Sequence, residues 1–269
     1  YAIFISRLNF LNGGFILKDK IKGLIKKYIK SYQKDEEIKS EWREPVVKFA
    51  DAADPLFKEL KNVVRPTHAL PKEILKEAQT VIAYFIPFAK SIANSNIEGK
   101  YSSKEWARAY VETNQLISDL NNYLKKELAD DNYQVSSIPA TNNFDKKSLM
   151  SDWSHRHVAY VAGLGSFGIN NMLITEKGCA GRIGTLITDI KIKPDKRDNK
   201  ESCLNKAGMN CSKCVERCVN GALKIDSFNR FKCYELLLEN DDFHDDSALT
   251  DVCGKCNVNL PCSFKDPVS

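Results

Sequence analysis

The sequence predicts an α+β core followed by a small cysteine-rich domain. Three observations indicate this: a β-branched and aromatic run at 80–88, a long helical pattern at 102–130, and eight of the nine cysteines within the last 67 of 269 residues. We expect residues 1–35 to form an apolar segment and an amphipathic basic helix. Residues 36–194 would form the α+β core, and residues 195–269 the small domain.

The N-terminal stretch does not look like a membrane span or a signal peptide. Residues 1–17 are apolar but interrupted by Arg7, Asn9 and a glycine pair, and their basic run follows rather than precedes them. The next stretch predicts a helix with one apolar face, although a membrane-surface helix is a second interpretation. That face comprises Ile21, Leu24, Ile25, Tyr28 and Ile29. The net charge of +5 is too diffuse to indicate nucleic-acid binding by itself.

The core elements follow from local signals. Pro71 begins a helix that leads into the buried strand "TVIAYFIPF". A Ser-Ser pair begins the long helix, with Glu105 placed for a capping box. The segment "DWSHRHVAYVAG" predicts a helix that ends at Gly163, and "NMLITEKGCAGRIGTLITDIKI" predicts two strands around a glycine-rich turn. Residues 194–202 are a charged linker.

The cysteines indicate metal ligation rather than disulfides. Without a signal peptide, the chain is expected to be cytoplasmic, where thiols stay reduced. "CSKCVERC" has the C-x2-C-x3-C spacing of the bacterial iron–sulfur run, whose last cysteine ligates the other cluster. This crossed rule predicts a ferredoxin-like domain with two [4Fe–4S] clusters. The first set of ligands is Cys203, Cys211, Cys214 and Cys262. The second set is Cys218, Cys233, Cys253 and Cys256.

Other interpretations of the cysteines and glycines are weaker. Cys211, Cys214, Cys253 and Cys256 could hold zinc, which leaves four thiols unused, and a single cluster is a further alternative. "GLGSFG", residues 163–168, matches a dinucleotide-binding glycine motif. That motif needs a strand before it and a helix after it. Here the order is reversed, so a dinucleotide site is not favoured.

The segments "HVAYVAGLGSFGINNMLIT" and "GRIGTLITD", the cysteine blocks and "CGKCNVNLPC" resemble epoxyqueuosine reductases. They are also similar to corrinoid reductive dehalogenases. The resemblance implies a nitroreductase-like, cobalamin-binding core before the two-cluster domain. It implies an oxidoreductase in which an external donor, such as ferredoxin or flavodoxin, supplies electrons through two clusters to a corrinoid that reduces a small organic substrate. tRNA is a further candidate partner. The alternative is a non-catalytic electron-transfer or corrinoid-reactivating partner protein.

The resemblance also implies a cofactor site. The loop with Gly163, Gly165 and Gly168, together with Asn170, would border the corrinoid. Cys179 would act near the cofactor as a ligand or redox partner. Arg182 would bind a phosphate or propionamide tail.

Catalytic candidates precede the glycine loop. The relatives carry an aspartate proton donor in this region, where this chain has Asp145 and Asp152. His155 and His157 follow, and histidine can supply a proton near neutral pH. We predict Asp152, His155 and His157 as catalytic residues. The alternative is a polar helix start capped by Asp152 or Ser154.

Overall fold

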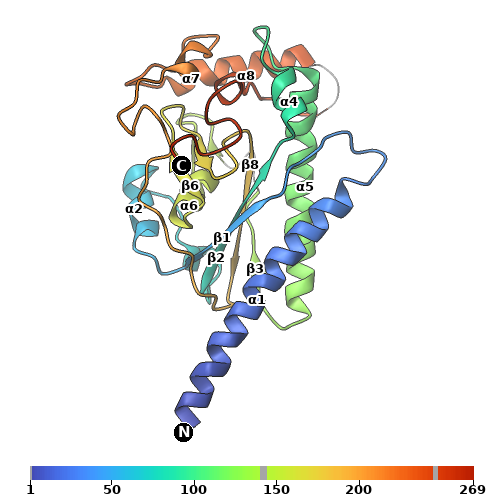
Figure 1. Ribbon diagram of the computed structural model, residues 1–269, viewed down its shortest axis with the longest axis vertical. Helices are drawn as coiled ribbons and strands as arrows, with labels where there is room; N and C mark the ends of the chain where they lie inside the picture. Colours follow the sequence, from blue (N-terminus) through green and yellow to red (C-terminus); the bar gives the residue numbers. More distant parts are fainter. Residues whose placement is uncertain (1, 140–143, 245–247) are drawn as a thin grey trace.

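A four-stranded antiparallel sheet lies at the centre of the chain (Figure 1). The computed structural model describes residues 2–139, 144–244 and 248–269, with side chains from residue 16 onward. The strand order is β1 (Val46–Asp51), β2 (Thr80–Pro87), β8 (Gly181–Thr188) and β3 (Val135–Ser136). All eight residues of β2 are buried, which confirms the predicted strand.

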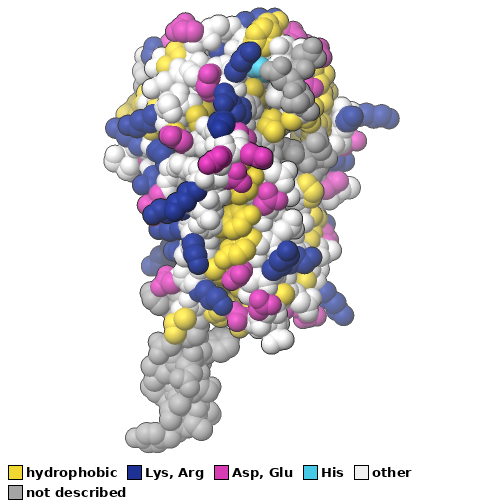
Figure 2. Space-filling view, turned by 90° about the vertical axis from the view of Figure 1, so that its right-hand side faces the viewer, with side chains coloured by type: hydrophobic (Ala, Val, Ile, Leu, Met, Phe, Trp, Pro, Cys, Tyr) yellow, Lys and Arg dark blue, Asp and Glu magenta, His cyan; other side chains and the backbone are white. Residues whose placement is uncertain are grey.

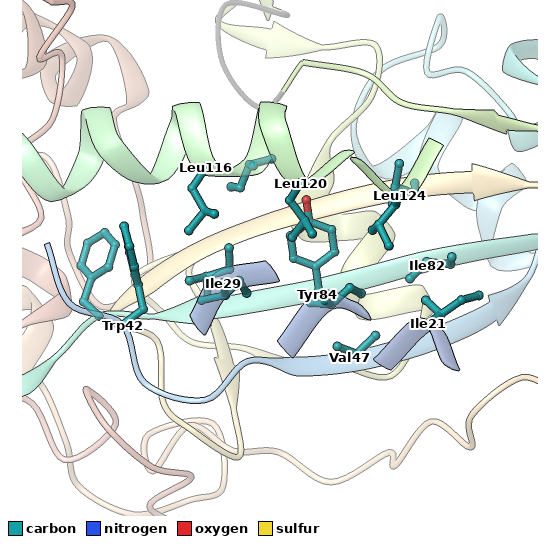
Figure 3. Packing of buried hydrophobic residues seen from close by; sticks show 14 of the residues in the cluster. Ile21, Ile29, Trp42, Val47, Ile82, Tyr84, Leu116, Leu120 and Leu124 are labelled. Carbon is teal, nitrogen blue, oxygen red and sulfur yellow. The ribbon is translucent and has the colours of Figure 1, made fainter. Parts of the chain in front are cut away.

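Helices cover both faces of this sheet. On one face lie α1 (Ala2–Tyr32) and α5 (Lys104–Ala129), and on the other lie α2 (Leu56–Val63) and α6 (His155–Val161). Figure 3 shows Ile21 and Ile29 from α1 and Leu120 from α5 around Tyr84 of β2. The predicted apolar helix face is therefore confirmed. It belongs to one continuous helix with the preceding apolar stretch.

The start of α5 differs from the predicted capping box. Ser103 is the N-cap, and its hydroxyl accepts a hydrogen bond from the Trp106 amide at 3.1 Å. The Ser102 hydroxyl instead lies 2.8 Å from Nε2 of His244, at the end of α8 (Arg230–His244). The capping box with Glu105 is wrong because Ser102 is used in this tertiary contact.

The glycine signals mark real chain turns. Gly163 follows α6 with φ +77°, as predicted for a helix end. The strands β6 (Gly165–Phe167) and β7 (Leu173–Thr175) pair only with each other, whereas β8 joins the main sheet. The charged linker runs along the sheet edge, where Asp195 exchanges backbone and side-chain hydrogen bonds with Phe49.

The cysteine-rich segment lies at one end of the sheet (Figure 1). It contains α7 (Lys213–Glu216), α8 and the short helix η1 (Lys255–Asn257). The remaining short elements are α3 (Pro71–Ile74), α4 (Lys90–Ser95), β4 (Phe144–Asp145) and β5 (Met150–Ser151). Among the described residues, no helix combines the length and apolarity needed to cross a bilayer. The mixed α and β architecture is confirmed, and the nitroreductase-like and ferredoxin-like descriptions stay predictions.

Candidate functional site

Four thiols from distant parts of the segment line one cavity. Its empty volume is about 330 Å³, and Gly168, Ile169 and Asn170 form part of its wall. The thiols belong to Cys203, Cys211, Cys214 and Cys262. Burial and then the neighbouring thiols raise the pKa of Cys214 to about 12. These are the four cysteines that the crossed rule assigns to the first cluster.

The other four predicted ligands also influence one another. Burial, followed by Cys253 and Cys218, raises the pKa of Cys233 to about 11. Cys256 has a raised pKa from burial and then from Cys253, Cys233 and Cys218. The amide of Leu223 donates to the Cys218 sulfur at 3.3 Å. The helix α7 carries Cys214 and ends two residues before Cys218. Cys214, Cys218, Cys256 and Cys262 nevertheless pack in one cluster, so the two predicted sets are in contact.

This grouping does not favour the single zinc site. Cys211 and Cys214 line the first cavity, whereas Cys253 and Cys256 have Cys218 as a neighbour. Within residues 2–139, 144–244 and 248–269, no three His, Cys, Asp or Glu side chains converge closely enough for a single metal ion. The first four thiols line one cavity, and the four cysteines of the alternative zinc site do not share it.

Close packing against α5 fixes the turn between Cys253 and Cys256. Gly254 has φ +70°, and a Cβ there would lie 2.2 Å from the Trp106 ring. The side chain of Asn96 donates to the Cys253 carbonyl at 2.9 Å and accepts from the Ser103 amide at 2.9 Å. Only glycine satisfies both the left-handed conformation and the contact.

A second tie holds Cys262 against the start of β8. The Cys179 amide donates to the Cys262 carbonyl at 3.0 Å, and the Ala180 amide donates to the Ser263 carbonyl at 3.1 Å. The Cys179 thiol donates to the Cys262 sulfur, which raises the pKa of Cys179 and lowers that of Cys262. Cys179, predicted to act near a cofactor, thus lies beside a thiol of the first set.

The predicted corrinoid loop packs within the chain. A Cβ at Gly165 would lie 2.1 Å from the Ile174 carbonyl oxygen, and one at Gly163 would lie 3.1 Å from the Arg197 backbone. Gly168 and Asn170 line the first thiol cavity. Asn170 also donates to the Cys256 carbonyl at 2.8 Å, so it connects the two sets.

Two arginines lie beside the second thiol set without a carboxylate partner. Neither Arg156 nor Arg182 takes part in an ion pair among the described residues. Desolvation lowers the pKa of both guanidinium groups, although the Arg156 side chain is accessible to water. The electrostatic neighbours of Arg156 include Cys256 and Cys233.

The Arg182 guanidinium lies against one aromatic ring. Its guanidinium carbon lies 4.3 Å from the centre of the Tyr110 ring, and the Tyr110 hydroxyl donates to Asp251 at 2.6 Å. Burial is the main cause of the raised pKa of Asp251. The Nε of Arg182 is buried without a hydrogen-bond partner in the described chain. A buried donor of this kind requires an acceptor, which a ligand can supply.

The structure does not bring the three predicted catalytic residues together. Asp152 is exposed, lies 3.2 Å from Nε of Arg65 and accepts a hydrogen bond from Thr67. His155 is buried, with Nδ1 2.8 Å from the Thr185 hydroxyl and Nε2 3.0 Å from the Pro139 carbonyl. His157 lies 2.8 Å from the Ser154 hydroxyl through Nδ1. Their catalytic roles stay predictions.

The sequence analysis did not select two site residues, Arg156 and Lys255. Arg156 lies between His155 and His157, and we used this segment to predict only the two histidines as site residues. Lys255 lies inside the "CGKC" turn and is buried, with 1% of its surface exposed. A charged residue between two expected ligands is a signal that the spacing analysis overlooked.

Comparison with known proteins agrees with the sequence resemblance. No family model matches the chain. An epoxyqueuosine reductase from Listeria monocytogenes is 28% identical over 224 residues, which cover 79% of this chain and 55% of the relative. The predicted resemblance to epoxyqueuosine reductases is confirmed. The chain spans about half the length of this relative.

Solved structures show the same fold at low identity. An epoxyqueuosine reductase from Bacillus subtilis aligns with a TM-score of 0.56 at 18% identity, over 93% of this chain and 66% of that one. An epoxyqueuosine reductase with a modified tRNA stem loop aligns with a TM-score of 0.53 at 18% identity, over 84% and 58%. The arrangement of elements is therefore that of these reductases.

We predict that Gly254→Ala disrupts the second thiol set. The added methyl group would meet the Trp106 ring and displace the turn that carries Cys253 and Cys256. The matched control is Gly208→Ala, which has φ +85° and nothing within 4 Å of the new Cβ. The control should cost only the backbone strain, about 1–2 kcal/mol. Denaturant unfolding and metal content measure both variants, and equal behaviour of the two would contradict the packing argument.

We also predict that buried His155 makes stability fall in mild acid. Desolvation lowers the pKa of His155 to about 4, below its unfolded value of about 6.5. The unfolded chain therefore binds the proton first, and stability is lost as pH falls through this window. Between pH 7.5 and 5.5 the loss from this group is about 1 kcal/mol. His155→Gln should reduce that slope in denaturant unfolding, and an unchanged slope would rule the assignment out.

Proposed function

We propose that this chain is an iron–sulfur oxidoreductase of the epoxyqueuosine reductase type, with two [4Fe–4S] clusters. One observation carries the proposal: the four cysteines that the crossed ligand rule assigns to the first cluster line one cavity. Cys253 and Cys218, assigned with Cys233 to the second cluster, are electrostatic neighbours of Cys233, and Arg156 is a neighbour of Cys233 and Cys256. Clusters held there would supply one-electron transfer.

The chain's own residues suit four-thiolate sites. The thiols are half-buried or buried, which limits contact with water. The Leu223 amide donates to the Cys218 sulfur, a contact that favours a sulfur carrying negative charge. Burial and neighbouring thiols raise the pKa values of Cys214, Cys233 and Cys256, so bound metal would replace the protons of these thiols. The donor chemistry therefore fits iron–sulfur clusters.

We further propose that the chain binds a corrinoid, whose low-potential cobalt would supply the reducing power. Arg182 and Arg156 would bind its amide or phosphate groups, because the buried Nε of Arg182 needs an acceptor. Asn170 and Gly168 lie against the first thiol set. We therefore propose that they border a cluster, and that Gly163 and Gly165 shape the loop.

The substrate is proposed to be organic, with the reductive loss of an oxygen or a halogen as the reaction class. Because one relative's structure contains an epoxyqueuosine-modified tRNA stem loop, that stem loop is the first substrate to test. On the described part of the face in Figure 2, basic and acidic side chains are interspersed. That pattern does not favour a nucleic acid on this particular face. A ferredoxin or flavodoxin is the proposed electron donor.

The catalytic interpretation is preferred to that of a partner protein without a reaction of its own, because the proteins that the chain resembles are reductases. The Nδ1 of His157 faces Ser154, and the described residues give its Nε2 no hydrogen-bond partner. Burial and then Arg156 lower the pKa of His157 to about 4, so its imidazole is neutral at pH 7 and can accept a proton, which does not favour the predicted role of proton donor.

The cluster proposal predicts about eight iron atoms and eight sulfides per chain after anaerobic purification. Cys214→Ser should lose about half of them, because one set is left with three thiolates. Met209→Ser, at an exposed position two residues before Cys211, is the control and should retain the full content. Bound zinc, or full iron content in Cys214→Ser, would refute the assignment.

The corrinoid proposal predicts a change in the visible spectrum when hydroxocobalamin is added to the anaerobic protein. Arg182→Gln should weaken binding about tenfold, since a hydrogen bond to a charged donor contributes about 1.5 kcal/mol or more. Arg108→Gln, at an exposed position on α5, is the control and should bind normally. Iron without any spectral response to the corrinoid would reject only this part of the proposal.

A further inference from the structure

Lys255 is a buried cation at the second thiol set. It follows Cys253 by two residues and immediately precedes Cys256. Its ammonium donates to the backbone carbonyls of Asn96, at 3.1 Å, and Glu98, at 2.6 Å. No ion pair of the described chain includes it. A buried charge without an anion is costly, so a nearby negative group is needed to balance it.

Two further cations face the same set of thiols. Arg217 immediately precedes Cys218 and is half-buried, and its Nε donates to the Lys255 carbonyl at 3.2 Å. It is an electrostatic neighbour of Cys253, as Lys255 is. Arg156, from α6, faces Cys256 and Cys233. Three cations are therefore electrostatic neighbours of three of these thiols, Cys253, Cys256 and Cys233.

The acids near this set do not cancel that charge. Asp251 accepts a hydrogen bond from Tyr110 at 2.6 Å and lies near Arg182. The Glu98 residue is exposed, and the Glu98 backbone carbonyl makes the contact with the Lys255 ammonium. Charge in water is screened far more than charge in the interior. The net charge of the side chains around the second set is thus positive before any cluster is bound.

The first thiol set has a different environment. Lys213 and Lys206 are its nearby cations, and both are exposed. Lys213 lies 2.8 Å from Glu216, and Lys206 lies 3.5 Å from Glu201. Solvent and these carboxylates neutralise most of their field. The two sets have the same ligands but unequal surrounding charge.

We infer that Lys255, supported by Arg217 and Arg156, makes a cluster at the second set easier to reduce than a cluster at the first. This rests on the proposed function. Reduction adds one negative charge, which a fixed positive charge stabilises, and net charge is one of the factors that set cluster potential. An electron supplied by an external one-electron donor would then reside mainly on the cluster at the second set. When it moves there from the first, the first is oxidised by one electron and the second is reduced by one.

The test is a redox titration of the anaerobic holoprotein with dithionite, followed by electron paramagnetic resonance. We expect two midpoint potentials, the higher one belonging to the second set, which Cys233→Ser identifies by abolishing or altering that signal. Lys255→Met should lower that potential and leave the other unchanged, whereas Lys255→Arg should preserve it. Lys232→Gln is the matched control, because Lys232 also adjoins a thiol of this set but is exposed. It should shift neither potential.

The outcomes separate the inference from the proposed function. If the wild-type protein contains no iron or does not respond to dithionite, the proposed function is refuted. Two clusters whose potentials are both unaffected by Lys255→Met, or a shift only in the first, would overturn the inference alone. If Lys255→Met fails to fold, Arg217→Gln removes a half-buried charge at the same set. An unchanged second potential in that variant would also overturn the inference.

Discussion

The structure of the site depends on how the last cysteine run is tied to the end of the sheet. Cys253, Cys256 and Cys262 lie in a segment with little regular structure, so backbone pairing within the segment cannot place them. Two contacts with the core do this: the approach of Gly254 to Trp106, and the pairing of Cys179 and Ala180 with Cys262 and Ser263. Both contacts use rigid elements of the core, α5 and the start of β8. The core elements α5 and β8 therefore determine where these thiols lie.

Charge gives a second level of organisation. Buried cations without carboxylate partners are unfavourable in a metal-free chain, and so are buried thiols that must lose protons. Here the two occur side by side at Lys255 and Cys253. Each compensates the other once the sulfur atoms carry negative charge. The arrangement is typical of a site whose stable form contains a bound group.

The sequence predicted the parts of the molecule that depend on local pattern. The strand at β2, the apolar face of α1 and the helix end at Gly163 all follow from periodicity or local turn signals. Contacts across the fold were not predictable in this way. Ser102 pairs with a distant histidine, Gly165 packs against β7, and His155 is enclosed by Thr185 and Pro139. Residue type alone cannot show whether a histidine faces a recess or the core.

The short helix α7 has a consequence for the distance between the two sets of thiols. Cys214 lies within it and Cys218 just after it, and the helix contains only four residues. A single turn of backbone cannot bend or lengthen appreciably, so relative movement of the core and the small domain would carry both sets as one body. Electron tunnelling is steeply sensitive to separation, so in the proposed two-cluster protein a spacer of this kind would hold the distance between the two clusters constant.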